Sequence, residues 1–140
     1  MKAMVPVKAN KDTEAGVMPS TELLDAMGKY NEEPVKAGIM LTGEGLHPTA
    51  KGARVAFSGD KRTVRPGPFK SKDLIAGFRV WDVTSLDEAI AWLERCPNPT
   101  GEDSEIEIRP IFEAEDFGEA FTPELQAQEE RLRAKLAAKR

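Results

Sequence analysis

The chain is 140 residues long, with 40% hydrophobic residues, 31% charged residues and a formal net charge of −4. These totals fit one globular domain with one core, and no apolar run approaches the roughly 20 residues that cross a bilayer. The N-terminus turns polar too early for a secretory signal. The single cysteine, Cys96, excludes an internal disulfide and a Cys-x-x-Cys metal site, so we expect a cytoplasmic protein.

Charge is distributed unevenly along the chain. Residues 47–81 hold eight lysines and arginines against two aspartates, whereas residues 82–119 hold twelve acidic residues against two arginines. The basic segment could attract an anion, pair with the acidic segment of the same or a second chain, or form a solvated face. Because few aromatic residues lie among the basic ones, we do not expect nucleic acid binding.

The N-terminal segment predicts a strand followed by a helix. Residues 1–9 alternate between faces as a strand does, although Pro6 lacks a ladder donor and favours an edge or a bulge. Ser20 is a suitable N-cap for the helix. Pro34 should kink or end that helix near Glu33, because the proline ring clashes with the preceding turn.

A second strand is predicted directly after the helix. Ala37-Gly38 supplies a C-terminal stop, and residues 39–46 begin with an apolar run. Gly43 and Gly45 leave little side chain there, which favours a bulge or the close approach of a ligand.

The middle of the chain predicts a β-hairpin and a central strand. Residues 53–57 alternate, residues 58–61 form a turn, and residues 62–65 pair back. Residues 77–83 are the strongest strand, with apolar residues pointing both ways: Phe78, Val80, Trp81 and Val83.

The C-terminal third predicts two helices around one strand. Ser85 and Glu88 form a capping box before an amphipathic helix, and residues 105–109 alternate as a strand. Thr122 then caps a charged last helix that has Pro123 in its first turn.

This order of elements follows split βαβ logic, with helices on one face of an antiparallel sheet. We therefore expect an α+β fold with a ferredoxin-like sheet over residues 1–120 and a separate charged helix over residues 121–140. The strand over residues 77–83 has apolar side chains on both faces, so the second face also needs a cover. The simplest cover is the same face of a second copy, and we predict a homodimer.

Several stretches resemble the YCII-related family, and more narrowly its DGPF-domain branch: MPSTELLDAMGKYNEE, VKAGIMLTGEGLHPTAKGARVAFSG, GPF, AGF, SLDEAIAWLERCP and EIEIRPIFEAEDFG. The resemblance covers about residues 1–120 and implies a ferredoxin-like fold that dimerises into an α/β barrel. Members of this family are often encoded beside extracytoplasmic-function sigma factors, and relatives in the wider fold include small-molecule enzymes.

The chain departs from the namesake motif of that branch, which reads Asp-Gly-Pro-Phe-Ala-Glu. Pro66 stands where the aspartate is expected, and Lys70 follows the phenylalanine. Pro6 and Pro34 also stand at positions where apolar residues other than proline are typical of the family. Chemistry that depends on acidic residues in this loop is therefore lost from this chain.

His47 is the only histidine and the candidate catalytic residue, because its unperturbed pKa near 6.5 suits proton transfer. The alternative is a loop histidine that bonds the backbone. In the broader family a His–Asp pair has been taken as a possible dyad, and this sequence shows no such pairing. Glu44 could orient the imidazole only if the irregularity at Gly43 and Gly45 turns both side chains into a cleft, since positions i and i+3 of a regular strand face opposite ways.

The basic hairpin supplies candidate ligand-binding residues. Arg54, Arg65 and Lys70, together with Lys72, could form an anion-binding rim, or a solvated charged edge that discourages strand aggregation. Phe69 follows a rigid Gly-Pro turn and could act as a lid over the sheet or as a core plug.

No metal site and no cofactor motif is expected, since one histidine and one cysteine far apart do not form a zinc set. The favoured function is a homodimer that binds a small anionic organic ligand in the barrel cleft, with cofactor-free proton transfer at His47 as its enzymatic form. The alternative is a non-catalytic sensor or interaction module linked to transcription regulation.

Overall fold

The computed structural model describes residues 1–100 and 102–139, and its contacts divide the chain into two units, Met1–Pro110 and Ile111–Arg140. The elements of the first unit are β1 (Lys2–Lys8), α1 (Lys11–Glu14), α2 (Thr21–Lys36), β2 (Met40–Gly45), η1 (Thr49–Lys51), β3 (Ala53–Ser58), β4 (Lys61–Pro66), β5 (Ile75–Asp82), α3 (Leu86–Glu94) and β6 (Arg109–Pro110).

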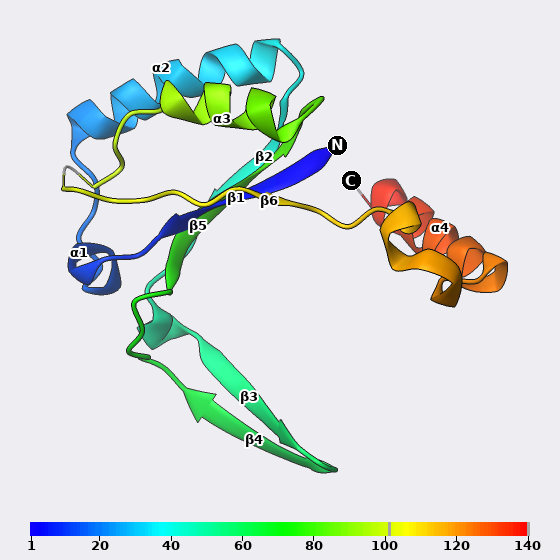
Figure 1. Ribbon diagram of the computed structural model, residues 1–140. Coiled ribbons are helices and arrows are strands. Elements are labelled where there is room, and N and C mark those ends of the chain that lie inside the picture. Colours follow the sequence, from blue (N-terminus) through cyan, green and yellow to red (C-terminus); the bar gives the residue numbers. More distant parts are fainter. Residues whose placement is uncertain (101, 140) are drawn as a thin grey trace. The chain divides into compact units, whose positions relative to one another are not determined.

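The first unit is an α+β structure built on a four-stranded antiparallel sheet with the order β2-β5-β1-β6. Helices α2 and α3 lie together on one side of this sheet (Figure 1). Strands β3 and β4 form a separate two-stranded sheet and lie between β2 and β5 in the sequence. The predicted α+β class and the split βαβ order of the four main strands are confirmed.

The hydrophobic core lies between the sheet and the helices. Ala3 of β1 pairs with Trp81 of β5, and both side chains are fully buried. Val5, Ile39, Val83 and Ala89 complete the set of buried hydrophobic residues. Val5 and Trp81 are among the largest fully buried side chains. Full burial of a large apolar side chain stabilises a fold by about 1.5–3 kcal/mol.

The opposite side of the sheet, called the open face below, is also apolar in its centre. Since side chains alternate along a strand, the register places residues of β1 and β5 on this side in adjacent pairs. All of them are only half-buried: Met4, Pro6, Phe78 and Val80. Strand β5 therefore has apolar side chains on both faces, as its sequence pattern predicts.

Pro34 does not end α2 at Glu33, so the prediction that the helix ends there is wrong. The helix continues to Lys36 with the ring of Pro34 fully buried. It ends as predicted at Gly38, which has a φ of +74°. The N–H of Ile39 donates to the Pro34 oxygen over 2.9 Å, which closes a Schellman-type cap. Burial of the ring and this cap hold the last turn together, although one helix hydrogen bond is missing.

Pro6 lies in an inner strand, not at an edge, because β1 runs between β5 and β6. Its oxygen accepts from the N–H of Glu107 over 3.3 Å, so the side of the residue that lacks a donor faces the β6 edge. Strand β6 has only two residues, and the missing donor therefore interrupts little of the ladder.

Two of the predicted helix caps form as expected, and the third forms in part. Ser20 and Thr122 accept from the N–H of Leu23 and Leu125, respectively. Ser85 also accepts from a backbone N–H, but the Glu88 carboxylate accepts from the Thr84 hydroxyl at 2.5 Å instead of closing a capping box. The capping box does not close because the Glu88 carboxylate, which it requires, accepts from the Thr84 hydroxyl instead.

The second unit contains η2 (Ala114–Ala120) and α4 (Pro123–Ala138). Three aromatic rings pack in series in this unit, with centroid distances of 5.1 Å between Phe112 and Phe117 and 5.4 Å between Phe117 and Phe121. Among the described residues, no helix has the length and apolar character to span a membrane.

Candidate functional site

The β3–β4 hairpin has two chemically different faces. Cross-strand pairing places Arg54 opposite Arg65, Ala56 opposite Thr63 and Ser58 opposite Lys61 on one side, called the polar face. The other side, called the apolar face, consists of the remaining paired positions: Ala53, Val55, Phe57, Arg62, Val64 and Pro66. All residues of both strands are exposed, so the hairpin carries both faces into solvent.

Two guanidinium groups share the polar face. Arg54 and Arg65 are directly opposite each other, an arrangement in which like charges destabilise a strand pair. The guanidinium of Arg54 also lies 4.0 Å from the centroid of the Phe69 ring. Among the described residues, neither arginine is paired with a carboxylate. An anion bound between them would remove the repulsion.

Phe69 is held in place by a chain of hydrogen bonds. Its N–H donates to the Thr49 hydroxyl over 3.0 Å. The Thr49 hydroxyl and N–H both donate to the Glu14 carboxylate, over 2.5 and 3.0 Å. Helix α1 thus fixes η1, and η1 fixes the loop that carries the aromatic ring. The ring is half-buried beneath Arg54 and outside the core cluster, so the core-plug interpretation of Phe69 is wrong.

Gly67 makes this seating possible. Its N–H donates to the Gly52 oxygen over 2.9 Å, and a Cβ at Gly67 would lie 1.7 Å from the Thr49 oxygen. Only glycine allows the loop to approach η1 so closely. Glu14 and Thr49 were missed by sequence reasoning, because neither belongs to a motif and they are 35 residues apart.

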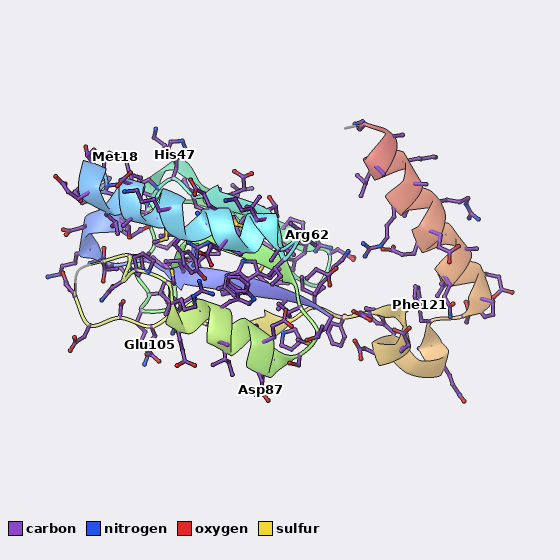
Figure 2. The ribbon with its side chains drawn as sticks, turned by 90° about the horizontal axis from the view of Figure 1, so that it is seen from above. Met18, His47, Arg62, Asp87, Glu105 and Phe121 are labelled. Atoms are coloured by element: carbon purple, nitrogen blue, oxygen red, sulfur yellow. The ribbon has the colours of Figure 1, made fainter. Side chains whose placement is uncertain are left out.

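Glu44 and His47 do not form a pair. Glu44 is opposite Phe78 in the sheet and therefore lies on the open face. His47 is exposed beyond the end of β2, and it lies at the outer edge of the first unit (Figure 2). No hydrogen bond or ion pair joins the two side chains within residues 1–100 and 102–139. Proton transfer by His47 stays a prediction.

The irregularity in β2 is not at the glycines. The register shifts between Met40 and Thr42, upstream of Gly43 and Gly45, so the predicted bulge position is wrong. Gly43 instead allows the approach of a side chain, since a Cβ there would lie 2.5 Å from Cε of Met40. Regular pairing through Glu44 then prevents the turn that would have brought Glu44 and His47 together.

Lys70 is the remaining predicted ligand-binding residue. It follows Phe69 directly and is exposed. The structure thus brings Arg54, Arg65 and Phe69 into one place and leaves Lys70 at its border. No cluster of three potential metal ligands occurs in the part of the chain that the structure describes.

A buried arginine lies apart from this site, between the sheet and α2. Arg79 of β5 is 7% exposed, and its Nη2 donates to the sulfur of Met27 over 2.9 Å. Nη1 has no hydrogen-bond partner, and the guanidinium lies 5.8 Å from the centroid of the Tyr30 ring. In the described structure no carboxylate is within ion-pair distance of this group.

The hydroxyl of Tyr30 and the thiol of Cys96, both near Arg79, have raised pKa values. Burial raises the pKa of Tyr30 to about 12, and the charge of Cys96 adds to the rise, whereas Arg79 and Arg95 oppose it. Burial also raises the pKa of the Cys96 thiol, and the charge of Arg79 opposes that rise. A protonated, half-buried thiol is a poor nucleophile.

These shifts predict a loss of stability at high pH. Tyr30 and Cys96 keep their protons to higher pH in the folded chain than in the unfolded chain, so their contribution is complete below their ordinary pKa values of 10.0 and 9.0. For Tyr30 the contribution is lost as the pH rises from 10.0 to about 12. Urea unfolding at several alkaline pH values should therefore show a falling free energy of unfolding, with a shallower fall for Tyr30→Phe. Equal slopes for both proteins would contradict the prediction.

A model of the YCII-related domain family matches residues 1–115, and the chain therefore belongs to the YCII-related family. The narrower DGPF branch stays a prediction. A search of curated proteins found no match. One similar solved structure is 5-chloro-2-hydroxyhydroquinone dehydrochlorinase (TftG) from Burkholderia phenoliruptrix AC1100, in complex with 2,5-dihydroxybenzoquinone. It is 16% identical, with a TM-score of 0.43, over 83% of this chain and 98% of that chain.

Proposed function

We propose that this protein is a homodimer that binds a small anionic organic ligand at the polar face of the hairpin. Arg54 and Arg65 are the anion anchor, and Phe69 is the apolar wall beside it. The observation that carries the proposal is the direct opposition of two arginines that have no carboxylate partner among the described residues. Guanidinium groups bind carboxylates through paired hydrogen bonds, and a planar ligand would also pack on the ring.

The homodimer follows from the open face. Met4, Pro6, Phe78 and Val80 are half-buried, and no helix of the same unit covers them. The same face of a second copy is complementary to it in hydrophobicity, and a self-complementary patch closes as a two-fold pair. Two sheets packed in this way, about 10 Å apart, make the dimeric α/β barrel.

Binding is better supported than catalysis. His47 is exposed and unassisted by Glu44, and Pro66 replaces the acidic residue of the branch motif. A ligand-binding site without a positioned acid or base suits a sensor, so the role as a sensor or interaction module linked to transcription regulation is the form of this proposal that we favour. Its ligand would be recognised by charge and planarity.

Isothermal titration with benzoate as the probe, and inorganic phosphate as a non-planar anion, tests the ligand site. We expect benzoate to bind the wild-type protein and phosphate to bind more weakly. Arg54→Met and Arg65→Met should each weaken benzoate binding about tenfold, which corresponds to about 1.4 kcal/mol. Arg62→Met is the matched control, because this arginine is on the opposite face of the same hairpin. Equal binding by the wild type and all three variants would show that the arginine pair is not the anchor.

A further inference from the structure

The apolar face of the hairpin has no cover in the described structure. Val55, Phe57 and Val64 are 49%, 72% and 66% exposed. The guanidinium of Arg62, 4.5 Å from the centroid of the Phe57 ring, is the local contact over this surface. An isolated two-stranded hairpin is at best marginally stable in water, and a hydrophobic face on such a hairpin needs a third surface to pack against.

The hairpin is placed to reach beyond its own subunit. It leaves the main sheet where β2 ends and β5 begins, and it projects away from α2 and α3 (Figure 1). Strands of six residues at about 3.3 Å per residue extend roughly 20 Å, about twice the spacing of two packed sheets. An arm of this length, directed away from the helices, is long enough to reach the layer that a second copy would occupy.

The charge of the hairpin favours a second copy of this chain as the surface on which it packs. The hairpin carries four cationic residues, Arg54, Lys61, Arg62 and Arg65, against one aspartate. None of the four forms an ion pair with a carboxylate of the same chain, as far as the described residues show. Residues 82–110 of the first unit hold eight acidic residues against two arginines. The basic arm and the acidic segment 82–110 are thus opposite in charge, and in a two-fold pair of chains each arm can pair with that segment of the other chain.

We propose that the hairpin is an exchanged arm, whose apolar face packs on a second copy of this chain. This inference goes beyond the homodimer proposed above, which requires only that the open faces meet. Each arm then brings its polar face, with the arginine pair, to the border between the subunits. The ligand site is consequently complete only in the dimer.

Analytical ultracentrifugation of the full chain from nanomolar to micromolar concentration tests the arm. Phe57→Glu should raise the dimer dissociation constant at least hundredfold, because it puts a charge into the packed face. Thr63→Glu is the matched control, since Thr63 is exposed on the polar face of the same hairpin, and its dissociation constant should stay within about threefold of the wild type. Circular dichroism of each variant establishes that the main sheet remains folded.

A second variant, in which residues 53–66 are replaced by two glycines, separates this inference from the proposed homodimer. A monomeric deletion variant beside a dimeric wild type supports the arm. A deletion variant that dimerises as tightly as the wild type overturns the arm and leaves the facing sheets intact. A monomeric wild type overturns both.

Discussion

Replacing Gly67 by alanine should lower the free energy of unfolding by about 3 kcal/mol, the upper part of the range for overpacking substitutions. The new Cβ would lie 1.7 Å from the oxygen and 2.6 Å from the carbonyl carbon of Thr49. Both are backbone atoms, so no side-chain rotation relieves the clash. The loop must move away from η1, which also breaks the hydrogen bond from Phe69 to the Thr49 hydroxyl.

Urea unfolding monitored by tryptophan fluorescence measures this loss. Gly45→Ala is the control, because a Cβ there has no atom within 4 Å, and its effect should be below about 1 kcal/mol. The Gly67 variant should also lose benzoate affinity through displacement of Phe69, whereas the Gly45 variant should keep it. Equal stability of the two variants would show that the loop seats on η1 less closely than the structure indicates.

Replacing Arg79 by methionine should raise the free energy of unfolding by about 1–2 kcal/mol, within the range found when buried charges are exchanged for hydrophobic residues of similar volume. Arg79 is 7% exposed, its Nη1 has no partner, and the sulfur of Met27 is a weak acceptor. A methionine keeps most of the aliphatic contact and removes the desolvated charge. Thermal and urea unfolding of the variant measure the gain.

Arg95→Met is the control for the second prediction. Arg95 pairs with Glu33 on the surface, and both side chains are more than half exposed. Loss of an exposed pair should cost no more than about 1 kcal/mol. If Arg79→Met is instead destabilised by several kcal/mol, the guanidinium has a strong partner in solution and the proposed energetic cost of burying it is wrong.

The sequence allows the residues of the candidate site to be singled out, but it does not show which of them come together. Arg54, Arg65 and Phe69 stand out in sequence, because a basic hairpin and a Pro-flanked Gly-Pro-Phe turn are local patterns. Their grouping depends on the hairpin register and on Thr49, which holds the loop 20 residues away in sequence. His47 was singled out for its chemistry, and no local pattern shows that it ends at the outer edge of the unit.

Errors arose where a local rule met a tertiary contact. Proline disfavours the interior of an isolated helix. In this chain the fully buried ring of Pro34 and the cap at Gly38 stabilise one further turn of α2. Pro6 is tolerated inside the sheet because its missing donor faces the short strand β6. Arg79 was unremarkable among apolar neighbours in β5, and its burial follows from the register that puts it on the same face as Trp81.

The sequence by itself determined the class of fold, the positions of β1, β2, β5 and the hairpin, and the starts of three helices, because alternation and capping depend on residues within one or two turns of each other. The strand predicted over residues 105–109 is reduced to Arg109–Pro110, with an isolated bridge at Ile106. The tertiary structure decided which side chains meet: Glu14 with Thr49, Thr49 with Phe69, and Arg54 with Arg65. These contacts join segments far apart in the chain, and their geometry follows from strand register and from the close approach that Gly67 allows. Local patterns carry no information on distances of that kind, whereas packing does.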